Sequence, residues 1–148
     1  MTRKAIETPK SKAIGPYSLG IDTGNIVFLS GQIPLDAATG KLVEGGIEAQ
    51  TEQVFANIKA LLEAAGLTMD HVAKATVFMT DLKEFAAMNG VYTKHVATPY
   101  PARSTIQVAG LPMALAGGTR RRQGGVVGDL VQQGLAPDFV RIGDTLGI

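Results

Sequence analysis

The spacing of apolar and polar positions divides the chain into two helical segments and five extended ones. Residues 48–65 carry apolar side chains at helical spacing, on one stripe made of Val54, Phe55, Ile58, Leu61, Leu62 and Ala65. Residues 81–96 are predicted as the second helix, because Asp81 and Glu84 have the spacing of a capping box. Its inward-facing side chains are expected to be Leu82, Phe85, Met88, Tyr92 and His95 or Val96. Strands are predicted over residues 3–8, 19–22, 25–34, 71–80 and 103–108.

The order of these segments is strand, strand, strand, helix, strand, helix, strand, which predicts an α+β fold. A length of 148 residues suits one domain, in which a single sheet carries both helices packed on one face. Residues 71–80 carry apolar side chains on both faces of their strand, as a largely covered strand does. The face of the sheet without helices therefore has to be covered by something else.

Residues 99–108 are the main candidate for a functional site, because an extended segment leads into a strand that begins with an arginine. Pro99 and Pro101 keep the chain out of a helix before the strand begins. The period-2 pattern then directs one row to the core and the other away from it; the expected core row is Ser104, Ile106 and Val108, and the other row is Arg103, Thr105 and Gln107. The guanidinium of Arg103 is suited to bind a carboxylate with two parallel hydrogen bonds. The alternative is an exposed arginine on an edge strand.

Gly31 and Tyr17 have two readings each from the sequence, and Asn89 has one. Gly31, which lies inside the predicted strand 25–34, is costly there unless a ligand approaches the backbone or the strand bulges. Tyr17 follows a Gly-Pro break, where it either walls a pocket or fills the interior. Asn89 is a polar residue in the middle of the second helix, where solvent exposure alone explains a polar side chain.

Composition removes several classes of function. The apolar fraction of 45% and the charged fraction of 18% are ordinary for a globular protein, and the net charge of +1 creates no field that would recruit nucleic acid or an anionic membrane. The chain has no cysteine, so disulfides and thiolate metal sites are excluded. His71 and His95 lie far apart without clustered carboxylates, so no metal site and no Ser-His-Asp triad are expected. No apolar run is long enough to span a bilayer and no secretory signal is evident, so a cytoplasmic protein is expected.

Several short motifs, taken in order, resemble those of one family. They are Ala13-Ile14-Gly15-Pro16-Tyr17-Ser18, Ser30-Gly31-Gln32-Ile33-Pro34-Leu35, Asn57-Ile58-Lys59-Ala60, Glu63-Ala64-Ala65-Gly66, Thr76-Val77-Phe78-Met79-Thr80-Asp81-Leu82, Phe85-Ala86-Ala87-Met88-Asn89, and Pro101-Ala102-Arg103-Ser104 followed by Ile106-Gln107-Val108-Ala109 and Leu111-Pro112. This series resembles the Rid (YjgF-type) family of imine and enamine deaminases over residues from about 5 to 112. So many matches in one order are more specific than any single motif.

The resemblance implies a Rid-like core over residues 1–112, with a chorismate-mutase-like architecture, and a homotrimer whose pockets lie between subunits. It also implies hydrolysis of 2-iminobutanoate and 2-iminopropanoate to 2-oxo acids and ammonia, without a cofactor. Arg103 would pair with the substrate carboxylate, while the backbones of Thr105 and Gly31 would approach substrate polar atoms. The resemblance places Tyr17, Ser30 and Asn89 around the same pocket. Many relatives have cysteine where this chain has Thr105, and threonine keeps the backbone donor.

The likeness stops after Pro112, and residues 113–148 form an atypical segment that completes or trails the same domain. Relatives continue with a closing strand whose glutamate is thought to activate water, yet this chain has no glutamate after Glu84. Residues 126–131 could supply a weak replacement strand, and residues 139–142 a short one. One hypothesis is a frameshift, because codons for residues 118–127 can spell an alternating, glutamate-bearing strand one base later; the coding DNA decides it. Loss of one positioned base costs about 10²–10⁴-fold in rate.

Two other functions stay open at this stage. One is a trimer that binds small carboxylates without turnover. The other is a ribonuclease or translation inhibitor, which would need a basic groove, and Arg120, Arg121 and Arg122 are its one candidate. A solvated loop explains these arginines better, so nucleic acid is not an expected partner. The deaminase ranks first.

Overall fold

The computed structural model describes residues 2–111 and 130–133. Its strands are β1 (Lys4–Ile6), β2 (Gly20–Asp22), β3 (Ile26–Leu29), β4 (Val72–Met79), β5 (Ala102–Gln107) and β6 (Leu130–Gln133). Its helices are α1 (Ile47–Ala64) and α2 (Phe85–His95), and two short 3₁₀ turns are η1 (Met69–His71) and η2 (Leu82–Glu84). None of the described helices is long and apolar enough to cross a membrane.

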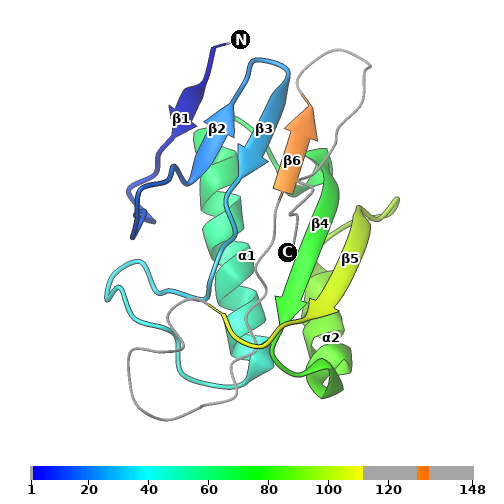
Figure 1. Ribbon diagram of the computed structural model, residues 1–148. Coiled ribbons are helices and arrows are strands. Elements are labelled where there is room, and N and C mark those ends of the chain that lie inside the picture. Colours follow the sequence, from blue (N-terminus) through cyan, green and yellow to red (C-terminus); the bar gives the residue numbers. More distant parts are fainter. Residues whose placement is uncertain (1, 112–129, 134–148) are drawn as a thin grey trace.

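The six strands form one mixed sheet in the order β1-β2-β3-β6-β4-β5. Strands β4 and β5 are parallel, because the chain between them crosses over through α2, and the other neighbours are antiparallel. Both helices lie on the same face of the sheet (Figure 1). The predicted α+β fold, one sheet with two helices on one face, is therefore confirmed.

The core lies between that face and the helices. The stripe predicted on α1 is confirmed, since Val54 and Leu61 are fully buried and Phe55, Ile58 and Leu62 nearly so. They meet the apolar row of the neighbouring strands, which consists of Val27, Leu29, Ala75, Val77 and Met79. The helix ends as the sequence predicts: Gly66 follows with a φ of +73°, a conformation that glycine adopts at little cost.

Strand β6 comes from the segment after the family likeness ends. It lies between β3 and β4 and pairs antiparallel with both, so it joins the two halves of the sheet. Of the replacement strand predicted over residues 126–131, Leu130 and Val131 lie in β6, which continues to Gln133, and residues 126–129 lie outside the described residues. The short strand predicted at 139–142 and the arginines at 120–122 lie outside them as well.

Two predictions about element bounds were wrong. Strand β3 ends at Leu29 and does not reach residue 34, because the backbone beyond it bonds to side chains and loops instead of a neighbouring strand. The second helix begins with the 3₁₀ turn η2, in which the Asp81 side chain accepts a hydrogen bond from the Lys83 N–H at 2.9 Å. Leu82 and Phe85, predicted to face inward, are 41% and 37% exposed, because that turn precedes the regular helix and shifts its phase.

The two rows of β5 are also opposite to the prediction. Ile106, expected in the core, is 46% exposed, and Ser104 accepts a hydrogen bond from Lys74 on the open face of the sheet. The parallel register explains this, because it sets Arg103 beside the buried Ala75 on the helix face. Arg103 therefore projects toward α2. The sequence alone predicted that the row containing Arg103 would point away from the core.

Candidate functional site

Arg103 lies at the start of β5 and reaches across to α2. Its Nη1 donates a hydrogen bond to Asn89 Oδ1 at 2.8 Å. Its guanidinium carbon lies 4.5 Å from the centre of the Tyr92 ring and 5.5 Å from that of Phe85. Phe85, Asn89 and Tyr92 are spaced by four and three residues, which places them on one face of the helix. The guanidinium is therefore oriented by an amide and by two aromatic rings.

The arginine borders a hollow of about 390 Å³, whose lining is Asn89, Tyr92, Thr93, Tyr100, Pro101 and Arg103. A guanidinium has five N–H donors, and Asn89 is its hydrogen-bond acceptor within the described residues. The donors that remain suit a carboxylate. The hollow has room for a small organic acid, with polar and apolar surface in its wall.

The backbone N–H and carbonyl of Thr105 lie at an open edge of the sheet. The Val108 N–H donates to the Met79 carbonyl at 2.8 Å, so the backbone groups of Ile106 and Ser104, two and four positions earlier, also face β4. The N–H and carbonyl of Thr105 consequently point to the opposite side. Strand β5 is last in the strand order of the described sheet, so this side is its open edge. Arg103 and Thr105 share a row and lie about 7 Å apart along the strand.

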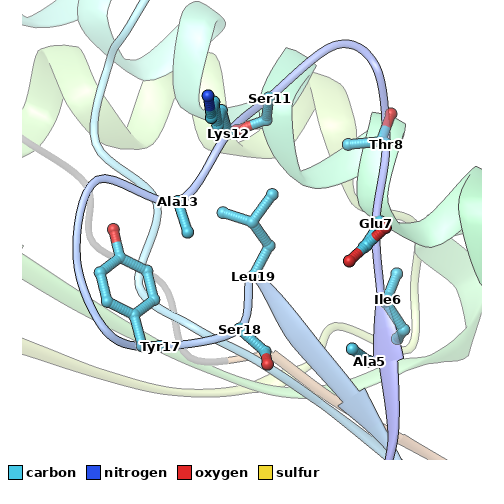
Figure 2. A pocket seen from close by; sticks show the side chains of 10 residues that line it. All are labelled: Ala5, Ile6, Glu7, Thr8, Ser11, Lys12, Ala13, Tyr17, Ser18 and Leu19. Atoms are coloured by element: carbon cyan, nitrogen blue, oxygen red, sulfur yellow. The ribbon is translucent and has the colours of Figure 1, made fainter.

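The other predicted residues gather at a different place. Ser30 donates its hydroxyl to the Ser18 carbonyl at 2.6 Å, and Gly31 follows it in the loop after β3 instead of inside a strand. Tyr17 is 46% exposed and borders a second hollow of about 390 Å³ beside β1. Figure 2 shows its ring at one side of that hollow, next to Ala13 and near Leu19.

A single copy of the chain thus brings Arg103, Asn89 and Thr105 together. It brings Tyr17, Ser30 and Gly31 together at a separate place. Tyr17 borders one hollow and Arg103 and Asn89 border another, and no hydrogen bond joins the two groups within the described residues. Sequence reasoning missed that Tyr92 and Phe85 hold the arginine. The signal was available, since both are at helical spacing from Asn89, but both were assigned to the core.

Asn57 fixes the loop that carries Gly31. From α1, its Nδ2 donates to the carbonyls of Ile33 at 3.1 Å and Leu35 at 3.0 Å, and its side chain is buried. Gln53 also donates to its Oδ1 at 2.9 Å. The side chain therefore substitutes for a strand partner, which explains why this segment is ordered without belonging to the sheet.

We expect Asn57→Ala to lower the free energy of unfolding by about 1–3 kcal/mol, because the carbonyls of Ile33 and Leu35 each lose a donor. Denaturant unfolding measures the loss, with the exposed Asn25→Ala as the control that should change little. Equal losses in the two variants would contradict the role of Asn57.

Tyr92 is unusual because its ring supports Arg103 while its hydroxyl is buried without a hydrogen-bond partner among the described residues. Burial raises the pKa of this hydroxyl above its ordinary value, and the positive charge of Arg103 opposes that rise. An unfolded tyrosine ionises near pH 10. Above about that pH the unfolded chain releases a proton that folded Tyr92 retains, so the free energy of unfolding falls as pH rises.

Tyr92→Phe should therefore reduce the fall in stability above about pH 10, while the guanidinium keeps its aromatic support. At neutral pH the variant should be as stable as the wild type or slightly more so, because an unpaired buried hydroxyl is removed. Denaturant unfolding at neutral and alkaline pH measures both effects. Tyr100→Phe is the matched control, since Tyr100 is 60% exposed. A Tyr92 variant with the wild-type pH slope would count against this explanation.

The two histidines have structural surroundings. His71 takes part in the cap of η1, where its Nδ1 lies 3.0 Å from the Thr68 hydroxyl. His95, the last residue of α2, lies between Glu52 and Lys59 of α1. Among the described residues no group of three or more histidine, aspartate or glutamate side chains could hold a metal ion.

Comparison with known proteins now identifies the class. A family model described as Endoribonuclease L-PSP matches residues 7–116, which is most of the chain. The chain therefore belongs to this family, which is the Rid (YjgF-type) family that the ordered motifs resemble.

Particular relatives add names to this assignment. Protein DfrA of Myxococcus xanthus is 50% identical over 115 residues, which cover 76% of this chain and 88% of that protein. A 2-iminobutanoate/2-iminopropanoate deaminase of Capra hircus is 41% identical over 113 residues, 76% of this chain and 82% of that one. The crystal structure of E. coli TdcF with bound serine superposes with a TM-score of 0.76 at 38% identity, over 89% of this chain and 99% of that one.

Proposed function

We propose that this protein is an imine deaminase, which hydrolyses small 2-imino acids such as 2-iminobutanoate and 2-iminopropanoate to 2-oxo acids and ammonia. The observation that carries the proposal is the orientation of Arg103 by Asn89 and Tyr92 beside a hollow of small-molecule size. The name of the goat relative supports the reaction, and the serine bound to TdcF supports a small amino-acid-like ligand.

In the proposed reaction Arg103 holds the substrate carboxylate by charge-assisted hydrogen bonds and so fixes the imine carbon in place. The N–H of Thr105 at the open edge of β5 donates to a substrate oxygen and limits rotation of the substrate about its contact with Arg103. Water adds to the imine carbon and forms a C–O bond. The C–N bond then breaks and the nitrogen leaves as ammonia with protons taken from water. The described residues supply binding and orientation to this sequence of steps, and no cofactor enters it.

We also propose that the working unit is a homotrimer whose sites lie between subunits. The open sheet face carries Phe28, which is 39% exposed, and Ile106, which is 46% exposed, so it has apolar surface to bury. A second copy would also bring the Tyr17 group of one chain to the Arg103 group of another. This arrangement explains why one chain holds the two groups of predicted site residues apart.

Mixed oligomers test the shared site. Arg103→Ala and Tyr17→Ala would each be inactive alone, and their co-assembled mixture should recover activity, because some interfaces pair two intact halves. Light scattering on the same samples gives the subunit number. Recovery without co-assembly, or co-assembly without recovery, would contradict a site built by two subunits.

The test of the reaction compares 2-iminopropanoate with an imine of similar size that lacks the carboxylate. The protein should accelerate ammonia release from the first and much less from the second, because the second has nothing to bind at Arg103. Equal acceleration of both substrates would argue for a site that does not use the arginine.

A second candidate is a binding protein for small carboxylates without turnover. It is favoured by the absence of glutamate after Glu84, since relatives are expected to use one for water activation. Calorimetry with 2-oxobutanoate separates the two candidates when combined with the ammonia assay. Binding that depends on Arg103 in a protein that releases no ammonia would establish the binder.

A further inference from the structure

A row of ring contacts runs from α1 to the guanidinium of Arg103. Phe55 of α1 stacks on the imidazole of His95, with ring centres 4.4 Å apart and planes 12° apart. The same Phe55 ring meets Tyr92 at 5.6 Å between centres and 68° between planes. Tyr92 in turn lies 4.5 Å from the guanidinium carbon of Arg103. Phe55 and Tyr92 are both buried, so the row passes through the interior.

Charged side chains of α1 fix the far end of this row. His95 Nδ1 lies 2.8 Å from Lys59 Nζ, and His95 Nε2 lies 2.6 Å from Glu52 Oε2. A lysine ammonium only donates, so Nδ1 accepts from Lys59 and the proton of the neutral imidazole is on Nε2, which donates to Glu52. Because one donor and one acceptor hold it in the plane of its ring, the imidazole cannot turn on the face of Phe55 without breaking a hydrogen bond.

Helix α2 needs such support because it is short and contains a glycine. It has 11 residues, whereas isolated helices shorter than about 12–15 residues are marginal in water, and Gly90 weakens its middle. Arg103 is held from both sides of that glycine, by a hydrogen bond to Asn89 before it and by the ring of Tyr92 after it. The ring contact is effective only within about 6 Å. The position of the second half of α2 therefore decides whether Arg103 keeps both supports.

We propose that Phe55 and His95 are positioning residues for Arg103, and through it for the substrate carboxylate. They hold the second half of α2 against α1, so that the Tyr92 ring stays beside the guanidinium. Among the described residues that line the hollow at Arg103, neither Phe55 nor His95 is present, so both act through Tyr92. The consequence for the reaction rests on the proposed function, whereas the consequence for the guanidinium does not.

Nuclear magnetic resonance of arginine side chains in the folded, full-length protein measures the position of the guanidinium. The Tyr92 ring shifts the guanidinium signals of Arg103, which are identified by their loss in Arg103→Lys. Phe55→Leu removes both ring contacts and keeps a large apolar side chain. In this variant the Arg103 signals should move toward those of the exposed Arg3. Unchanged signals in a folded Phe55→Leu protein would overturn the proposal.

The Michaelis constant gives a second readout, which loss of stability alone does not move in a folded protein. A misplaced Arg103 should raise KM for 2-iminopropanoate by about 2- to 30-fold in Phe55→Leu and change kcat little, since the carboxylate contact exists in the ground state. Leu61→Val, which shortens a buried side chain of α1 outside the row, is the control and should keep the wild-type KM and Arg103 signals. Equal rises in KM for the two variants would count against a specific role of Phe55.

Two changes at His95 give a test at a position that is 15% exposed, where folding is least at risk. His95→Gln removes the ring that stacks on Phe55 and should raise KM in the same direction. His95→Phe restores a ring there and should lie nearer to the wild type. The reverse order would overturn the role assigned to the stack.

The wild-type protein separates this proposal from the proposed function. Ammonia release by the wild type, together with wild-type KM and Arg103 signals in Phe55→Leu, would contradict the positioning role and leave the deaminase intact. If the wild type releases no ammonia, the deaminase is wrong, and the Arg103 signals still decide the positioning role. Calorimetric binding of 2-oxobutanoate then replaces KM, and Phe55→Leu should weaken it.

Discussion

Replacing Arg103 with alanine is expected to lower kcat/KM for 2-iminopropanoate by about 100- to 1000-fold, which corresponds to roughly 3–4 kcal/mol of lost transition-state binding. The physical reason is that the carboxylate loses a paired, oriented guanidinium while it is still removed from water. Steady-state kinetics should place much of the loss in KM, because the same contact exists in the ground state.

Arg103→Lys sharpens this experiment because it retains the charge. Lysine lacks the planar fork and cannot donate to Asn89 and to both carboxylate oxygens in the same geometry. We expect a loss of at least about tenfold, between the wild type and the alanine variant. Full activity in Arg103→Lys would mean that a point charge suffices and that the alignment by Asn89 and Tyr92 has no catalytic value.

Leu61→Ala should have the largest effect on stability, a loss of about 2–5 kcal/mol in the free energy of unfolding. Leu61 is 0% exposed in the last turn of α1, so its truncation removes buried contacts and leaves a cavity. Denaturant unfolding measures the loss at one fixed protein concentration, because an oligomer unfolds in a concentration-dependent way.

Leu82→Ala is the matched control, since it makes the same chemical change at a side chain that is 41% exposed. It should cost less than about 1 kcal/mol. Equal losses in the two variants would mean that the interior is placed elsewhere than between the sheet and α1.

Helix α1 could be predicted because its apolar stripe is continuous and Gly66 ends it. The end of β3 could not, because residues 26–33 alternate well and the side-chain bonds of Asn57 that divert the chain come from far along the sequence. The face of β5 was predicted wrongly for a similar reason. A period of two gives two rows, and only the parallel pairing with β4 decides which row meets the helices.

The candidate site was predictable in part. The sequence pointed to Arg103 through its chemistry, and the resemblance added Asn89 and Thr105, which the structure brings close to it. Tyr92 was assigned to the core because an aromatic side chain at helical spacing is usually buried for packing; here it is buried and also supports a charge. The separation of Tyr17 and Gly31 from Arg103 depends on tertiary structure, which no pattern along the chain encodes.

The most direct test of the proposed function is ammonia release from 2-iminopropanoate that an amino-acid oxidase generates in the same solution. The wild-type protein should accelerate release in a saturable manner, and Arg103→Ala should leave it near the spontaneous rate. That result would establish a deaminase anchored at Arg103 that works without a glutamate after Glu84. No acceleration by a folded wild-type sample would contradict the proposed reaction and leave carboxylate binding as the function of the site.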